Sequence, residues 1–127
     1  MCTRLAMSAL VLVSCGGRAG GVQTAAEAQG EVYYAEGRTL YDELESEQDM
    51  VEARSLFEKS CDLGNGAGCF YLAVMWERGQ GWFEDPALAA LLLERACTLG
   101  EGGACTLLGA RCRMQEIWKQ PGARCLP

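Results

Sequence analysis

The sequence predicts an all-α fold, a short solenoid of helical hairpins that disulfide bonds cross-link. A repeat of 36 residues runs through much of the chain, as the step from Asp49 to Asp85 indicates. Apolar residues recur within it at three-to-four spacing, the period of an amphipathic helix. Eight cysteines among 127 residues indicate a disulfide framework formed in an oxidising compartment. This length predicts one small domain.

The repeat defines two full units, residues 49–84 and residues 85–120. Shifting the chain by 36 positions superposes Asp49 on Asp85, Ala53 on Ala89, Leu56 on Leu92, Glu58 on Glu94, Cys61 on Cys97, Gly64 on Gly100, Cys69 on Cys105 and Leu72 on Leu108. A further shift places Tyr33 and Tyr34 where Cys69 and Phe70 stand. We therefore expect residues 31–48 to form a cysteine-free half repeat that caps the stack, and residues 121–127 to form a tail held by a disulfide.

Each unit carries the signals of two helices. Asp49 and Asp85 are expected as N-caps, Pro86 takes the first helical position, and Gly64 and Gly100 follow the last periodic residues. The first helix of each unit is amphipathic, whereas the second, expected to begin near Ala67 or Gly103, is apolar on most sides. A helix that is apolar around much of its circumference needs neighbours on both sides, which stacked hairpins provide.

The first 30 residues are typical of an export leader followed by a tether. Arg4 precedes an apolar core at residues 5–13, and residues 12–15 spell Leu-Val-Ser-Cys. This quartet resembles the lipobox of bacterial lipoproteins, which implies a signal peptide over residues 1–14 and a lipid on Cys15. An ordinary signal peptide cleaved nearby is the alternative. The glycine-rich residues 15–30 predict a flexible tether between the lipid and the domain.

Lipidation predicts a location in the bacterial cell envelope, because several acyl chains on one cysteine anchor a protein stably to a membrane. Gly16 stands where inner-membrane lipoproteins of enteric bacteria typically carry aspartate. The outer membrane is therefore the favoured anchoring site.

Charge and residue types argue against several functions. The net charge is −6, and residues 27–62 hold eleven acidic and three basic side chains, which argues against nucleic acid as a partner. The acidic run predicts either a solvated helix face or a surface for a basic partner. The chain contains no histidine, so no imidazole is available to bind a metal or act as a base. We predict no metal site, no cofactor and no catalytic residue.

Two segments carry a family resemblance. Residues 53–69 follow the pattern A-x-x-L-F-E-K-S-C-D-L-G-N-G-A-G-C, and residues 79–90 read G-Q-G-W-F-E-D-P-A-L-A-A. They resemble Sel1-like repeats, specifically the cysteine-rich kind of the Helicobacter cysteine-rich proteins. The resemblance covers roughly residues 31–114. It implies a right-handed stack of helix pairs in which Cys61 bonds to Cys69, and Cys97 bonds to Cys105. The chain departs from the family pattern at Trp82, where a small aliphatic residue is usual, and at Tyr33, which replaces a cysteine.

The same two pairings are plausible on geometric grounds. A turn between two helices brings the end of one beside the start of the next, so cysteines eight positions apart can lie within disulfide range. Six cysteines follow Cys15, and six allow fifteen connectivities. Cys112 and Cys125 are paired only because they remain after the other four cysteines have been assigned. A reactive thiol at Cys112, between Arg111 and Arg113, is the alternative.

The resemblance implies a binding module rather than an enzyme. Sel1-like proteins mostly serve as adaptor scaffolds, so we expect an envelope-anchored scaffold for a protein or peptide partner. Trp82 and Phe83 in the inter-repeat loop are the candidate binding residues, and packing beneath the loop is their other possible role.

β-Lactam binding or weak β-lactamase activity, as described for cysteine-rich Sel1-like proteins, is the alternative function. The chain has no Ser-x-x-Lys motif, and neither Ser55 nor Ser60 has a lysine at that spacing. A purely structural role in the envelope is a third hypothesis.

Overall fold

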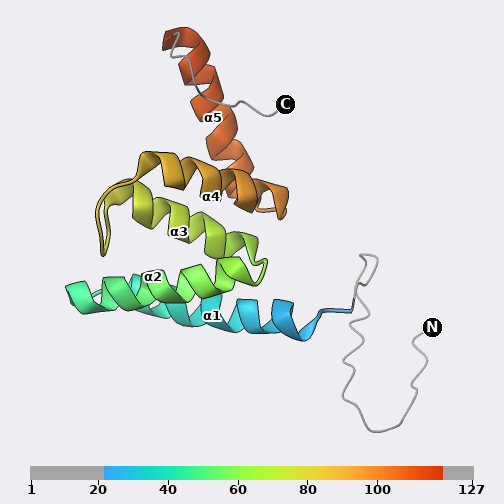
Figure 1. Cartoon of the computed structure of the whole chain (residues 1–127), viewed down its shortest axis with the longest axis vertical. Helices are drawn as coiled ribbons and strands as arrows, with labels where there is room; N and C mark the ends of the chain where they lie inside the picture. The colour runs from blue at the N-terminus through green and yellow to red at the C-terminus, as the bar shows by residue number, and fades with distance from the viewer. Residues whose placement is uncertain (1–21, 119–127) are drawn as a thin grey trace, which may run out of the picture.

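The computed structural model describes residues 22–118, with side chains up to residue 111. Within that range the chain forms five α-helices and no strand: α1 (Ala25–Asp42), α2 (Glu47–Asp62), α3 (Gly66–Arg78), α4 (Pro86–Thr98) and α5 (Gly102–Trp118). Figure 1 shows them as a stack of helical hairpins. The predicted all-α hairpin solenoid is therefore confirmed.

The helices stack in chain order. Contacts are extensive between α1 and α2, α2 and α3, α3 and α4, and α4 and α5, so α3 is covered on both sides, by α2 and by α4 (Figure 1). Helices α2 and α3 form the first full unit, α4 and α5 form the second, and α1 occupies the place of the half repeat. None of the described helices combines the length and apolar content that crossing a membrane requires.

The first helix corrects one expected boundary. Residues 15–30 were expected to form a tether, but α1 begins at Ala25, so the last six residues of the expected tether, residues 25–30, are helical. Thr24 and Glu27 form a capping box, in which each side chain accepts a hydrogen bond from the other's backbone N–H. Gly30 is buried, and its carbonyl oxygen accepts a 2.7 Å hydrogen bond from the Ser60 hydroxyl. Its glycine character therefore permits close packing and does not indicate a flexible segment.

A second correction concerns the start of α2. Ser46 is the N-cap, and Asp49, which was expected to cap the helix, is the third residue of a capping box. The Ser46 hydroxyl accepts from the Asp49 N–H at 3.2 Å, and the Asp49 carboxylate accepts from the Ser46 N–H at 2.9 Å. In the second unit, Asp85 caps α4 and Pro86 follows it, as predicted. Leu88 at the third position of α4 cannot return a hydrogen bond to the cap, so the two units begin differently.

The turns inside the two hairpins are equivalent. Gly64 and Gly100 adopt left-handed backbones with φ of 86° and 94°, and their N–H groups donate at 3.0 Å to the carbonyl oxygens of Cys61 and Cys97. A residue with a side chain rarely adopts this conformation, which explains glycine at both positions. The second helices begin at Gly66 and Gly102, one residue before their predicted starts.

Small residues let the helices of the core approach closely. Fully buried Phe57, Met75 and Leu93 lie among a set of buried alanines and cysteines, namely Ala53, Ala73, Ala89, Ala96, Ala104, Cys61 and Cys69. The Phe57 ring lies so close to Gly37 that a methyl group there would come within 3.0 Å of the ring. Tyr34, Tyr41 and Tyr71 surround the same ring at centroid distances of 5.3 to 6.3 Å. Aromatic packing thus joins the cysteine-free α1 to the stack.

Candidate interaction site

The loop between α3 and α4 displays two large aromatic side chains. Trp82 is 60% exposed and Phe83 is 80% exposed, so neither ring packs beneath the loop. Their centroids lie 5.9 Å apart in an edge-to-face arrangement. Val51 on the neighbouring helix is also exposed. A pair of exposed aromatic rings is typical of protein-binding surfaces, which are enriched in tryptophan and other aromatic residues.

Backbone contacts anchor this loop to the stack. It descends from the end of α3 toward the start of α2, where Gly81 lies against the backbone of Met50 (Figure 1). A Cβ atom at Gly81 would come within 3.2 Å of the Met50 carbonyl, and its φ of 76° also favours glycine. The Asp85 N–H donates to the Trp76 carbonyl at 2.9 Å, and the Tyr41 hydroxyl donates to the Gln80 side chain at 3.1 Å. These contacts fix the backbone of the loop that bears the two exposed rings.

Arg54 on α2 lies close to two indole rings beside the loop. Its guanidinium carbon is 5.3 Å from the centroid of Trp76 and 5.1 Å from that of Trp82. Both distances fit cation–π contacts. Arg54 was not predicted as a site residue from the sequence. The 36-residue shift aligns it with Ala90, so the first unit has a cationic side chain where the second has a methyl group.

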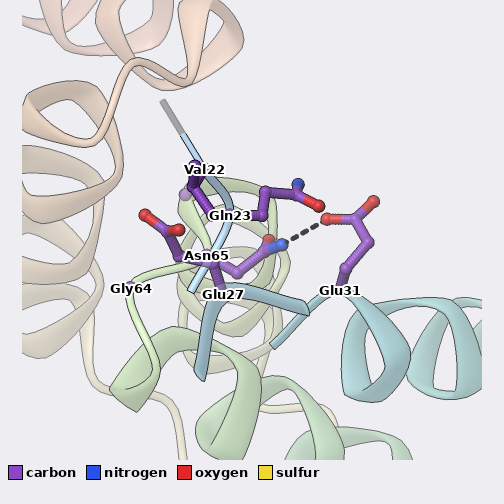
Figure 2. Close-up of a pocket in the computed structure, with 7 residues that line it drawn as sticks. Val22, Gln23, Glu27, Glu31, Gly64 and Asn65 are labelled. Atoms are coloured by element: carbon purple, nitrogen blue, oxygen red, sulfur yellow. Dashed lines mark hydrogen bonds between the residues drawn. The ribbon is translucent and has the colours of Figure 1, made fainter. Parts of the chain in front are cut away.

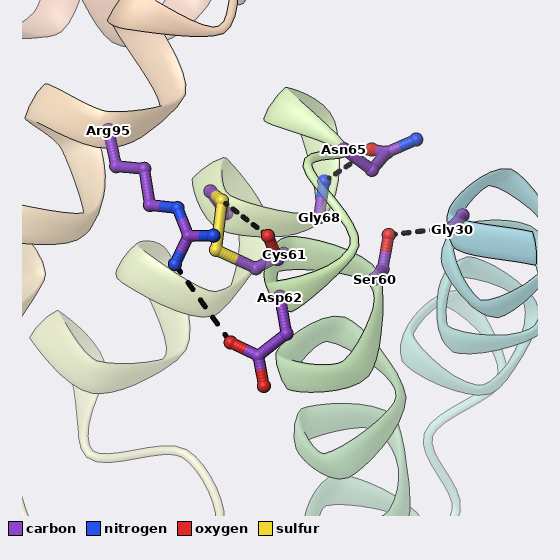
Figure 3. The surroundings of a disulfide bond; sticks show 8 residues. Gly30, Ser60, Cys61, Asp62, Asn65, Gly68 and Arg95 are labelled. Carbon is purple, nitrogen blue, oxygen red and sulfur yellow. Dashed lines mark hydrogen bonds and ion pairs between the residues drawn. A yellow bond between two sulfur atoms is a disulfide. The ribbon is translucent and has the colours of Figure 1, made fainter. Parts of the chain in front are cut away.

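The C-terminal end of α2 contacts both α1 and α4 (Figure 3). There Ser60 reaches α1 through Gly30, and Asp62 lies 3.9 Å from Arg95 of α4. Both members of that ion pair are largely exposed, so its contribution to stability is small.

The structure joins the two cysteine pairs that the family resemblance implies. Cys61 bonds to Cys69 with a Cα separation of 4.5 Å, and Cys97 bonds to Cys105 with a separation of 4.7 Å. The first pair is buried, whereas Cys105 is exposed. The predicted roles of Cys15, Cys112 and Cys125 concern side chains outside the described residues.

Two surface hollows are lined by neither Trp82 nor Phe83. The first, of about 320 Å³, lies between the start of α1 and the α2–α3 turn (Figure 2). Its polar groups already serve the fold, because Asn65 donates to Glu31 at 2.7 Å and Glu27 caps α1. The second, of about 400 Å³, is lined by Leu40, Glu43, Glu45 and Asp49. The Ser46 hydroxyl that donates to Asp49 holds the pKa of this carboxyl below its usual value.

The described residues contain no group of side chains suited to hold a metal ion. Ser60, a conceivable nucleophile, is fully buried and donates its hydroxyl proton to a backbone carbonyl. Burial, followed by the nearby Tyr71, raises the pKa of Tyr34, which lies in the aromatic packing between α1 and the stack. This raised pKa thus follows from a structural contact.

Comparison with known proteins gives a short match. No protein-family model matches the chain. A segment of 35 residues is 49% identical to "Putative beta-lactamase HcpC" of Helicobacter pylori strain ATCC 700392 / 26695, and equally to the protein of that name in strain J99 / ATCC 700824. The match covers 28% of this chain and 12% of each relative. Its length is close to that of one repeat unit.

Proposed function

We propose that the chain is a cysteine-rich Sel1-like lipoprotein of the bacterial cell envelope that serves as a protein- or peptide-binding scaffold. The observation that carries the proposal is the anchored α3–α4 loop, which holds Trp82 and Phe83 in solvent. Exposed aromatic rings on a rigid support lose little conformational entropy when a partner covers them. The rings supply binding area, and the helical stack supplies the support.

Three features support the family assignment. They are the 36-residue period, the disulfide within each hairpin, and the partial identity to the Helicobacter pylori relatives. Because the matched segment spans 12% of those relatives, their activities are not transferred with it. The proposal rests on this chain's own surface.

The envelope location rests on the sequence. The lipobox ending at Cys15 supports a lipid anchor, favoured in the outer membrane, and intramolecular disulfides suit an oxidising compartment. Removing residues 1–14 leaves ten basic and seventeen acidic side chains, a net charge of −7, because Arg4 is the one charged residue removed. This balance favours a protein or peptide over nucleic acid.

Photo-crosslinking in the intact envelope tests the function. A photoreactive phenylalanine analogue replaces Phe83 in one variant and Leu91, which is 62% exposed on α4, in the control. The position-83 probe should give one defined adduct, whose partner is identified by mass spectrometry, and the position-91 probe should not. Adducts that are identical at both positions, or absent at position 83, would contradict a specific partner at this loop.

β-Lactam binding or weak hydrolysis is the second candidate, favoured by the name of the Helicobacter pylori relatives, which calls them putative β-lactamases. The chain offers little for hydrolysis, because it has no histidine and no Ser-x-x-Lys motif. Incubating the purified protein with a chromogenic β-lactam tests hydrolysis. Repeated turnover would establish an enzyme, whereas no colour change beyond the buffer control would rule out hydrolysis and leave the scaffold role or β-lactam binding without turnover.

A further inference from the structure

Among the five arginines whose side chains the structure describes, Arg54 differs from the other four in its polar contacts. Four of them have a polar partner: Arg38 pairs with Asp42 at 2.8 Å, Arg78 donates to the Tyr41 hydroxyl at 3.5 Å, Arg95 lies 3.9 Å from Asp62, and Arg111 pairs with Glu77. Arg54 makes no hydrogen bond or ion pair with any residue that the structure describes. Arg38 is the closest comparison, because it also lies over an aromatic ring, that of Tyr71 at 4.6 Å.

The surroundings of Arg54 remove water without replacing all of its hydrogen bonds. Trp76 and Trp82 lie within cation–π range, and the side chain is only partly accessible. Its Nε–H is buried and has no acceptor, whereas the two terminal Nη groups are not among the buried, unpartnered atoms. A cation desolvated in this way gains more from an arriving anion than one surrounded by water. The guanidinium is therefore prepared to receive an acceptor at its outer end.

A carboxylate suits the open end of this guanidinium. Arginine donates two parallel hydrogen bonds to a carboxylate, and such charge-assisted bonds are stronger than neutral ones. Beside it, the exposed faces of Trp82 and Phe83 offer apolar area for a neighbouring side chain. A ligand that matches both features carries an acidic group next to an aromatic or aliphatic group.

We propose that Arg54, Trp82 and Phe83 form a docking site for a peptide segment with one carboxylate beside a large apolar side chain. The carboxylate accepts hydrogen bonds from the Nη groups of Arg54, and the apolar side chain packs on the two rings. The eleven acidic side chains of residues 27–62 disfavour runs of acidic residues in the partner, which narrows the ligand to a single carboxylate. This inference rests on the proposed binding function and specifies the partner's chemistry.

Matched peptides test the proposal. Three short fluorescent peptides share a central Phe-X-Leu, where X is Glu, Gln or Lys, and their binding to the full protein is followed by fluorescence polarisation. The Glu peptide should bind about tenfold or more tightly than the Gln peptide, as expected for a hydrogen-bonded ion pair. Arg54→Gln should abolish that preference, Arg54→Lys should restore it in part, and Trp82→Ser should weaken binding of all three peptides.

Arg38→Gln is the matched control, because it removes a cation over an aromatic ring at another place and should leave peptide binding unchanged. Far-UV circular dichroism checks that each variant is folded, and Trp82→Ser, which alters an exposed side chain, remains informative if Arg54→Gln does not fold. Equal binding of Glu and Gln peptides, or preference for Lys, would overturn the carboxylate site but leave a peptide-binding scaffold. Absence of binding by all three peptides would also overturn this site, and the scaffold would then depend on the crosslinking result.

Discussion

We predict that removing each disulfide separately lowers the stability by unequal amounts, although the two closed loops are the same length. Both bonds join cysteines separated by 8 residues, so the entropic effect on the unfolded chain is about 2.6 kcal/mol in each case. The buried pair has a further cost. Cys61 is 1% exposed and Cys69 is 0% exposed, so Cys61→Ser with Cys69→Ser places two hydroxyls in the core. A buried hydroxyl without a partner costs about 1 to 3 kcal/mol.

We therefore expect a loss of at least about 5 kcal/mol for Cys61→Ser with Cys69→Ser, and of about 2.6 kcal/mol for Cys97→Ser with Cys105→Ser, whose second cysteine is exposed. At about 5 °C per kcal/mol for a domain of this size, the thermal midpoint should fall by roughly 25 °C or more for the first pair and by roughly 13 °C for the second. Circular dichroism at the helical band measures both midpoints. Equal shifts, or a larger shift for the exposed pair, would refute the argument from burial.

Three further predictions concern lipidation, reduction and pH. We expect the protein to incorporate labelled fatty acid and Cys15→Ser not to incorporate it; equal labelling of the two, or labelling of neither, would contradict a lipid anchor at Cys15. A mild thiol reductant should open Cys97–Cys105 before Cys61–Cys69, because Cys105 is exposed and the other pair is buried. Alkylation at timed intervals, followed by mass analysis, measures the order of reduction, and the reverse order would contradict the argument from burial. The Asp49 carboxylate has a lowered pKa in the folded state, so its stabilising effect is complete above its unfolded pKa and disappears as the pH falls below about 4. The stability difference between wild type and Asp49→Asn should shrink over that range, and a constant difference would show that the carboxylate's charge contributes nothing.

Periodicity and cap residues predicted most of the helical architecture. Pro86 after Asp85 identified the start of α4, and Gly64 and Gly100 identified the turns, because these residues have strong local backbone preferences. The two boundary errors have different causes. The repeat suggested that Asp49 caps α2 as Asp85 caps α4, but Ser46 takes that role.

Gly30 was misread because a glycine that permits helix contact looks the same in sequence as one in a linker. A methyl group at Gly30 would approach the Leu63 side chain to 3.2 Å. A methyl group at Gly66, the equivalent position one repeat later, would approach the Leu99 side chain to the same distance. The 36-residue shift relates these contacts, so the repeat alignment carried a signal that composition alone concealed.

The candidate site was predictable only in part. Trp82 and Phe83 were identified by their residue types and their place in a loop, but the contact of Gly81 with α2, which anchors that loop, could not be predicted from the sequence. The surroundings of Arg54 come from Trp76 of α3 and Trp82 of the following loop. That its Nε–H group has no acceptor can be recognised only when all neighbouring side chains are placed. Such contacts between distant residues leave no local pattern.

We expect each of the two hairpins to be closed by its own disulfide in the native protein, as it is in the structure. Peptide mapping of protein isolated from its own envelope, alkylated and digested with trypsin without reduction, tests it directly. Cleavage after Lys59 and Arg78 releases residues 60–78 with Cys61 and Cys69, and cleavage after Arg95 and Arg111 releases residues 96–111 with Cys97 and Cys105. Each peptide should be unalkylated, separate from the other, and two hydrogens lighter than its reduced form. A covalent link between the two peptides would contradict the closed hairpins, and alkylation of all four thiols would contradict both the hairpin disulfides and export to an oxidising compartment.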